Sequence, residues 1–421
     1  MLIHYSALTL MSYFILFFRI CLLAATVVLL LLNEHKGTYE HLIHQSTNMS
    51  MHALVVVDEV PEKDIIKIYE VESRPQLMTS TVPSNYKKHI GFLKVHKAAS
   101  TTTQGIILRF GWVWNLTFIL PPEYGPFFYP NIISLYDSIN KENMLPPPPG
   151  RTFDILCHHV VYDRDAWAKV LPADAAIVGT IREPLSHFRS VVRYFFPQVL
   201  MDLRNTSDDP IEEFLLSTKL REKQSPKYTV LNNRLSFEYG VPINVITRRN
   251  ITAFNAYVND VLDKEFSVVI LAERFNEGLV LMRRMLNWNL KDILYALKMR
   301  NPQKPIFTVT EYHREMHRQY ASLDYLLYEH FVNRFNRQIE LEGESFQPEV
   351  EHFTKTLQDV ETFCHVNRRY ADYLTVAASE FNAEFRVDTF DCRLLHLQEI
   401  SFTQKIRVRQ YGSALWRYGH H

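Results

Sequence analysis

The stretch that most limits the fold of this chain is residues 92–103, Phe-Leu-Lys-Val-His-Lys-Ala-Ala-Ser-Thr-Thr-Thr. An apolar strand ends near Lys97, and small and hydroxyl side chains then lead directly into a helix. Backbone N–H groups at the start of such a helix point toward an anion, and the helix dipole favours negative charge there. The Gly-Lys-Ser/Thr ending of a nucleoside triphosphatase loop is missing, since Lys97 precedes the hydroxyl run. The pattern indicates a phosphate-binding turn, with an ordinary strand-to-helix junction capped by Ser or Thr as the alternative.

A second turn of this kind lies within residues 175–196. An apolar strand over 175–181 ends at Arg182, and Pro184 stands where a helix would begin. Ser190 follows about two turns into that helix, near the strand end at about 1.5 Å per residue. Arg182 offers a planar fork of donors and Ser190 a hydroxyl, which together suit a phosphate. The alternative is a surface arginine and a serine that bonds back to its own helix.

Strands and helices alternate along the chain. Apolar strands are expected over 90–95, 153–157, 175–181 and 268–272, and helices over 101–110, 185–195 and 276–286. The alternation predicts an α/β fold: a P-loop-like, three-layer domain with a central parallel sheet flanked by helices, followed by a helical C-terminal region. Ligands of such sheets bind at the carboxyl ends of the strands. Five polar residues fall at these ends and are expected to lie together: His96, Lys97, His158, His159 and Arg182.

Three further segments narrow the assignment. They are residues 268–298, residues 323–335 (Leu-Asp-Tyr-Leu-Leu-Tyr-Glu-His-Phe-Val-Asn-Arg-Phe) and Ile-Leu-Cys-His-His at 155–159. With the two turns, they resemble the galactose-3-O-sulfotransferase family of Golgi enzymes, which includes galactosylceramide sulfotransferases. The resemblance covers roughly residues 87–345. The chain departs from the family at Ala99, where Gly or another small residue is frequent, at Glu183, where Asp is common, and at Arg274, where an aromatic is common.

The resemblance implies a sulfotransferase whose sulfate donor is 3′-phosphoadenosine 5′-phosphosulfate (PAPS). Lys97 is then the cation that reaches the bridging oxygen of the leaving phosphate, a role that suits a mobile point charge. Lys94 is its rival, although the spacing along a strand turns it away from Lys97. Residues expected around the 5′-phosphosulfate are Lys97, Ala98, Ala99, Ser100, Thr101 and Thr102, and those around the 3′-phosphate are Arg182, Ser190 and Tyr194.

The acceptor hydroxyl also needs a base. His159 is the first candidate and His158 the second, because a histidine with a near-neutral pKa suits general-base catalysis in a slightly acidic lumen. The alternative is that one or both histidines are structural. Glu273 also ends a strand and could serve as base, orient the donor, or pair with Arg274. No metal is required, because cationic side chains neutralise the phosphates, and no Cys/His spacing resembles a zinc site.

The leading hypothesis is therefore PAPS-dependent transfer of sulfate to the 3-hydroxyl of galactose in a glycolipid or glycoprotein glycan. Other acceptors, such as a glycosaminoglycan uronic acid, remain open, as does a non-catalytic glycan-binding protein on this fold. A P-loop kinase is disfavoured because no acidic motif for Mg²⁺ ends a strand. Lys+Arg and Asp+Glu both number 46, so no net basic charge points to nucleic acid.

The chain ends indicate a membrane-anchored protein. Residues 5–32 are almost wholly apolar and long enough to cross a bilayer, although Arg19 interrupts them. We expect an uncleaved signal anchor with a short cytoplasmic tail in residues 1–32, with a cleaved signal whose core is 21–32 as the alternative. Residues 33–86 read as a stem and 87–421 as a lumenal sulfotransferase domain. The resemblance implies a single-pass type II protein of the Golgi membrane.

Four cysteines are present, and Cys21 falls in the apolar segment. Cys364 and Cys392 flank a C-terminal helical stretch, and a disulfide between them is expected. Cys157 lies in an apolar strand and is expected to be a buried thiol. The sequence leaves a homodimer open.

Overall fold

The computed structural model describes residues 85–122, 130–195, 197–204, 207–296, 310–366 and 372–412. The predicted anchor and nearly all of the predicted stem lie outside these residues. Among the helices that are described, none is long and apolar enough to cross a membrane. Tyr86, the last residue assigned to the stem, is already buried and donates a hydrogen bond to Asp292.

A four-stranded parallel sheet forms the centre of the structure. Its strands are β1 (Ile90–Leu93), β2 (Ile155–Leu156), β3 (Ala176–Ile181) and β4 (Phe266–Leu271), in the spatial order β2-β1-β3-β4. The strands are almost entirely buried, which explains why they read as continuous apolar runs rather than as alternating ones. The predicted α/β class with a central parallel sheet is confirmed.

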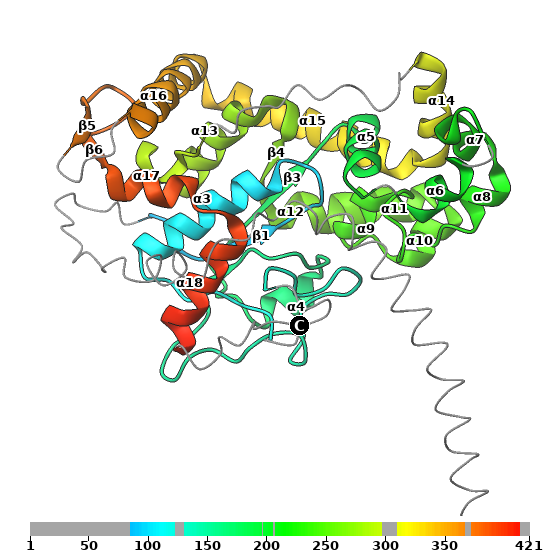
Figure 1. The fold of residues 1–421 in the computed structure, drawn as a ribbon, viewed down its shortest axis with the longest axis horizontal. Helices are drawn as coiled ribbons and strands as arrows, with labels where there is room; N and C mark the ends of the chain where they lie inside the picture. The colour runs from blue at the N-terminus through cyan, green and yellow to red at the C-terminus, as the bar shows by residue number, and fades with distance from the viewer. Residues whose placement is uncertain are drawn as a thin grey trace, which may run out of the picture. The chain divides into compact units, whose positions relative to one another are not determined.

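Helices flank this sheet, and they lie on both sides of the strands in Figure 1. Their bounds are α3 (Ser100–Val113), α4 (Arg164–Ala168), α5 (Pro184–Phe195), α6 (Gln198–Arg204), α7 (Pro210–Leu216), α8 (Thr218–Glu222), α9 (Arg234–Glu238), α10 (Ile243–Arg248), α11 (Ile251–Tyr257), α12 (Asp263–Glu265), α13 (Phe275–Leu286), α14 (Glu311–Tyr320), α15 (Ser322–Glu342), α16 (Phe346–Val366), α17 (Thr389–His396) and α18 (Glu399–Tyr411). The three helices predicted after strands correspond to α3, α5 and α13.

Two predicted strands are shorter in the structure. The strand predicted over 90–95 ends at Leu93, because the backbone turns there and the Val95 N–H donates to the Leu93 carbonyl. The strand predicted over 153–157 contains only Ile155 and Leu156. The loops that carry the candidate site therefore begin earlier in the sequence than predicted, at residues 94 and 157.

Close packing against the sheet depends on small residues at particular places. A Cβ atom on Gly278 of α13 would lie 2.6 Å from Cγ2 of Ile270 in β4. A Cβ atom on Gly91 of β1 would lie 2.6 Å from Cδ1 of Ile177. A larger side chain at Gly278 would therefore push α13 away from β4, whereas one at Gly91 would require the end of the Ile177 side chain to move.

The C-terminal region is helical, as predicted, but it also contains a two-stranded antiparallel sheet that the sequence did not suggest. Its strands are β5 (Tyr373–Val376) and β6 (Phe385–Asp388), which contact α16 and α17 respectively. The strands are half exposed, so they lack the apolar run that marks the central sheet. The predicted disulfide between Cys364 and Cys392 joins α16 to α17, and Cys157 is a buried thiol, as expected.

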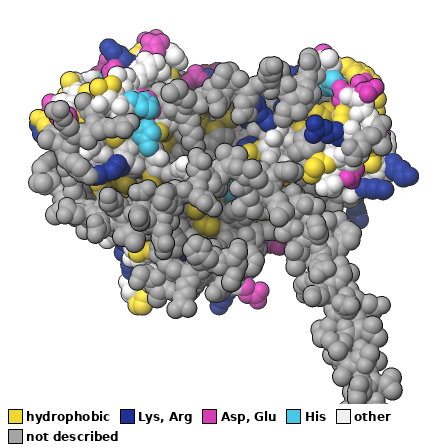
Figure 2. All heavy atoms as spheres, viewed as in Figure 1, with side chains coloured by type: hydrophobic (Ala, Val, Ile, Leu, Met, Phe, Trp, Pro, Cys, Tyr) yellow, Lys and Arg dark blue, Asp and Glu magenta, His cyan; other side chains and the backbone are white. Residues whose placement is uncertain are grey.

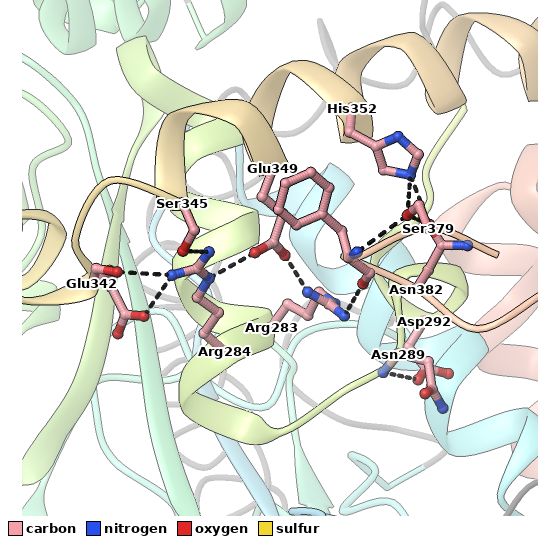
Figure 3. A network of polar contacts seen from close by, with 11 residues as sticks. Arg283, Arg284, Asn289, Asp292, Glu342, Ser345, Glu349, His352, Ser379 and Asn382 are labelled. Atoms are coloured by element: carbon pink, nitrogen blue, oxygen red, sulfur yellow. Dashed lines mark hydrogen bonds and ion pairs between the residues drawn. The ribbon is translucent and has the colours of Figure 1, made fainter.

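One buried carboxylate attaches α16 to α13. Glu349 of α16 is 2% exposed and forms ion pairs with both Arg283 and Arg284 of α13 (Figure 3). Arg284 also pairs with Glu342 at 3.0 Å, and Arg283 donates to the carbonyl of Phe381 at 2.6 Å. Both arginines are mostly buried, so their charges depend on these partners.

Replacing Glu349 should test this attachment. Glu349→Ala leaves two partly buried guanidinium groups without their shared carboxylate, so we expect the free energy of unfolding to fall by about 3 kcal/mol. Glu342→Ala removes a more exposed partner of one arginine and should cost about 1 kcal/mol or less. Chemical denaturation of both variants would measure the difference, and equal losses would contradict the assignment.

Candidate functional site

The turn between β1 and α3 has the backbone geometry of an anion site. Lys97 and Ala99 both adopt positive φ angles, 56° and 62°. Left-handed residues in a turn direct successive N–H groups to one side, which forms an anion-binding concavity. Helix α3 starts at Ser100, its N-cap residue makes no side-chain cap hydrogen bond, and its first turn holds no acidic residue. The first amides of α3 therefore have no side-chain acceptor of their own, as an anion site requires.

The hydroxyl groups of this turn differ in their surroundings. The Ser100 hydroxyl is buried and donates to the Val95 carbonyl at 2.5 Å, so it closes the turn. Thr101 is exposed and Thr102 half-buried at the start of α3. In this arrangement Ser100 would contact a ligand through its amide, and the two threonines through amide or hydroxyl.

The two predicted phosphate-binding turns contact each other. Nη1 of Arg182 donates to the Lys97 carbonyl at 3.2 Å. Nζ of Lys97 lies 3.7 Å from the centre of the Tyr194 ring. Tyr194 and Ser190 are one helical turn apart on α5, where Ser190 is half-buried. The structure thus brings Lys97, Arg182 and Tyr194 together from two distant parts of the sequence.

The first N–H groups of α5 donate to a side-chain carboxylate, unlike those of α3. The Glu183 carboxylate accepts from the N–H groups of Leu185 and Ser186, and it also binds Arg314 at 2.8 Å. An anion beside α5 would therefore be held by side chains such as Arg182 rather than by the helix end.

Glu273 lies in the short 3-10 turn Ala272–Arg274 that follows β4, and it binds the turn that precedes α5. Its Oε1 accepts from the Glu183 N–H at 2.9 Å, and its Oε2 accepts from the Tyr328 hydroxyl at 3.3 Å. The pairing of Glu273 with Arg274 that the sequence suggested is not found, because Arg274 pairs with Glu277. Glu273 therefore fixes the backbone beside Arg182.

Lys94 does not lie beside Lys97 and Arg182. Its side chain is buried and forms an ion pair with Glu399 of α18. Asn131 donates to the same carboxylate. The separation of Lys94 from Lys97 that strand alternation suggested is therefore found, and Lys97 is the lysine that lies beside Arg182.

The two candidate bases lie in different environments. Nδ1 of His159 is 2.9 Å from the Lys94 carbonyl, so Nδ1 carries the proton and Nε2 retains a lone pair. The near-neutral pKa expected for His159 is not found, because burial, followed by the nearby His96 and Lys94, lowers its pKa well below the usual value. His158 is fully buried, and its Nδ1 is 2.9 Å from the Gln104 amide nitrogen. Burial also lowers the pKa of His158 well below its usual value. Of the two, His159 is the half-buried one.

A buried ionic group that sequence reasoning missed lies behind His159. The His159 ring stacks on His96, with centroids 3.8 Å apart and planes 14° from parallel. Nδ1 of His96 is 2.5 Å from Oε1 of Glu238, which also accepts from Nε of Arg234 at 2.6 Å. Burial alone would raise the pKa of Glu238, but the charges of His96 and Arg234 and the hydrogen bonds from His96 lower it to about 2.

Comparison with known proteins agrees with these motifs. The family model for galactose-3-O-sulfotransferase matches residues 16–377. The chain belongs to the galactose-3-O-sulfotransferase family.

Individual family members are moderately similar. Mouse (Mus musculus) galactose-3-O-sulfotransferase 3 is 29% identical over 311 residues, which are 73% of this chain and 66% of the relative. Human (Homo sapiens) galactosylceramide sulfotransferase is 28% identical over 280 residues, 66% of this chain and 64% of the relative. Pig (Sus scrofa) galactose-3-O-sulfotransferase 2 is 27% identical over 286 residues, 66% of this chain and 68% of the relative. The chain thus spans about two thirds of the length of each relative.

The buried hydroxyl in the first turn provides a stability test. Ser100→Ala leaves the buried Val95 carbonyl without its donor, so we expect the free energy of unfolding to fall by about 1 to 2 kcal/mol. Thr101→Ala removes an exposed hydroxyl one residue later and should change it by about 0.5 kcal/mol or less. Urea denaturation of the two variants measures the difference. No loss in Ser100→Ala would mean that the turn is closed by other contacts.

Proposed function

We propose that this protein transfers sulfate from PAPS to the 3-hydroxyl of galactose in a glycolipid or glycoprotein glycan. The observation that carries the proposal is the contact between the two phosphate-binding turns, in which Arg182 donates to the Lys97 carbonyl. One turn offers the amides at the start of α3, and the other offers a guanidinium group. A nucleotide with phosphates at both its 5′ and 3′ positions needs two such adjacent anion sites.

The residues of the two turns would bind different phosphate groups of the donor. The amides of Ala98 to Thr101, with the Thr101 and Thr102 hydroxyls, would hold the 5′-phosphosulfate. Arg182 and Ser190 would hold the 3′-phosphate, with Tyr194 on the same side. The Lys97 ammonium would stabilise the charge that develops on the phosphate oxygen as its bond to sulfur breaks.

His159 is the base that the geometry favours. As the galactose oxygen bonds to sulfur, its proton must leave, and Nε2 of His159 retains the lone pair that can accept it. His158 is less suited, because it is fully buried and bound to Gln104. His96 and Glu238 would act as positioning residues, since His96 packs flat against the base and Glu238 fixes His96.

A polar surface pocket on the segment that is hydrogen-bonded to the His159 backbone is a candidate acceptor site. The N–H groups of Ile133 and Ser134 both donate to the His159 carbonyl at 3.0 Å, which fixes this segment beside the base. The pocket has a volume of about 290 Å³, and its polar lining includes Tyr136, Asp137, Asn140, Glu142 and Asn143. Such side chains suit a neutral sugar, because they can hydrogen-bond hydroxyl groups and pack an aromatic ring beside them.

The alternative acceptor, a uronic acid in a polyanionic glycosaminoglycan, fits this pocket less well. Asp137 and Glu142 would face the acceptor carboxylate, although Asp137 is paired with Lys227 at 2.8 Å. Acidic and basic side chains are interspersed over the described part of the face in Figure 2, whereas a polyanion calls for a basic groove. A non-catalytic glycan-binding protein would need neither the Lys97 turn nor Arg182.

The proposed location is the lumenal side of the Golgi membrane, with residues 1–32 as a type II anchor. The disulfide between Cys364 and Cys392 supports a lumenal domain, because structural disulfides form in the secretory compartments rather than in the cytosol. The family match reaches back to residue 16, within the proposed anchor.

Substitution of the donor residues tests the proposal. The full chain, purified in detergent, is given labelled PAPS and a panel of galactosylceramide, lactose-type glycans and a heparan fragment. We expect label on the galactose 3-hydroxyl, a loss of about 100-fold in kcat for Lys97→Ala, and about tenfold or more weaker binding of 3′,5′-bisphosphoadenosine for Arg182→Ala. Arg189→Ala, an exposed arginine on α5, is the matched control and should leave both unchanged.

The other outcomes decide among the alternatives. Label only on heparan would favour the glycosaminoglycan acceptor. No label on any acceptor, together with no binding of the bisphosphate product, would contradict the donor site and favour a binding protein.

The pH dependence of the reaction tests the base. A general base works in its neutral form, and the pKa of His159 is lowered, so the base stays neutral through the interval in which an ordinary histidine titrates. We expect kcat/KM to stay flat between about pH 6 and pH 8 and to fall only at lower pH. His159→Ala should remove this acid limb and most of the activity, whereas a fall centred near pH 6.5 would assign the base to a different group.

A further inference from the structure

A cluster of possible metal ligands lies at the disulfide, outside the proposed sulfate-transfer site. Glu361 and His365 are one turn apart on α16, and His396 ends α17. Oε1 of Glu361 is 2.8 Å from Nε2 of His365 and 3.3 Å from Nε2 of His396. The three ligand atoms all lie within 4.8 Å of one another. Two imidazoles and one carboxylate therefore converge on one point from two helices.

The orientation of His396 is that of a metal ligand. Its Nδ1 is 2.9 Å from the carbonyl oxygen of Cys392, one turn earlier on α17, so Nδ1 carries the proton. Nε2 contacts the Glu361 carboxylate at 3.3 Å, so a metal ion bound there would take the place of the proton between them. A histidine that binds a metal through one nitrogen commonly donates from the other to a carbonyl, which fixes both the tautomer and the ring.

The disulfide holds the ligands in place before any ion arrives. Cys364 directly precedes His365, and Cys392 is the residue whose carbonyl binds His396. The bond between these cysteines joins the two helices that carry the ligands. Because the ligands are already assembled, little conformational entropy is lost when an ion binds.

A second cluster, of two carboxylates and one histidine, is less suited to binding a metal. Asp209, Glu212 and His313 also bring three ligand atoms within 4.8 Å of one another. Nδ1 of His313 accepts from the Thr310 N–H at 3.2 Å, so the proton of the neutral ring lies on Nε2. That proton would occupy the nitrogen that a metal needs.

We propose that Glu361, His365 and His396 bind one divalent transition-metal ion, with zinc as the best fit. Zinc takes imidazole and carboxylate ligands in a tetrahedral arrangement, which leaves a fourth position for water. Calcium and magnesium prefer sets of oxygen ligands, which this cluster lacks. The side chains of His365 and His396 are 57% and 40% exposed, which provides an entry path. The ion would strengthen the attachment of α17 to α16 and does not depend on the proposed enzymatic activity.

Metal binding by the full chain tests the site. The protein is purified without reductant, stripped with a chelator and titrated with Zn²⁺ by equilibrium dialysis or with Co²⁺ by visible absorption. We expect one high-affinity ion per chain, a rise in melting temperature with Zn²⁺, and cobalt bands of a tetrahedral nitrogen and oxygen site. His365→Ala and His396→Ala should each weaken binding by about tenfold or more. His352→Ala, on the same helix but bound to Asn382, is the matched control and should bind normally.

Three results would overturn the proposal. Wild-type protein that binds no stoichiometric ion would leave the cluster as an ion-pair group only. A sulfur-to-cobalt charge-transfer band would assign the metal to cysteine. Binding that survives in His365→Ala and His396→Ala but is lost in Glu212→Gln would assign it to the other group. His365 is mostly exposed, so its variant should fold, and its melting temperature without metal verifies this.

Discussion

The carboxylate of Glu238 accepts three hydrogen bonds at the start of the turn between β1 and α3. Two come from the amide and ring of His96, and one comes from the Arg234 guanidinium. A buried carboxylate without partners would cost several kcal/mol, so this site is stable only with all three donors in place. His96 directly precedes Lys97, and its carbonyl accepts from His187 of α5. The position of the candidate phosphate-binding turn therefore depends on this one buried charge.

Glu238 is itself fixed by a second layer. It ends the short helix α9, whose N–H groups at Leu235 and Ser236 donate to the buried carboxylate of Asp324 on α15. Burial raises the pKa of Asp324 to about 6, although these hydrogen bonds oppose the rise. Two buried carboxylates thus fix α9 against α15 and His96 against α9. Together they hold the edge of the sheet where Arg182 contacts the Lys97 carbonyl.

The donor half of the candidate site could be predicted from the sequence, and the reason is geometric. Lys97 and Arg182 each follow an apolar strand, and parallel strands end at the same edge of a sheet, so local patterns place both residues together. Glu238 and Arg234 gave no such signal. They lie on α9, which is only one turn long, and His96, the partner of Glu238, is 142 residues away in the sequence. The candidate acceptor pocket is formed by an irregular segment that contains the isolated bridge of Ile132 with His159, and irregular backbone has no periodicity to read. The candidate metal cluster of Glu361, His365 and His396 was missed because its third residue comes from a different helix.

The stacked pair of His96 and His159 links the buried charge to the chemistry. Two parallel imidazole rings in contact cannot both be protonated without a compensating negative charge, and Glu238 supplies one such charge. Burial lowers the pKa of both histidines, while the Glu238 carboxylate, which also pairs with Arg234, acts in the opposite direction on His96. In the proposed reaction His159 would gain a proton from the acceptor, and the new positive charge would lie next to the His96 ring, which contacts the Glu238 carboxylate. Under that proposal Glu238 would stabilise the protonated base through His96, and this stabilisation would offset the cost of placing a positive charge in a buried site.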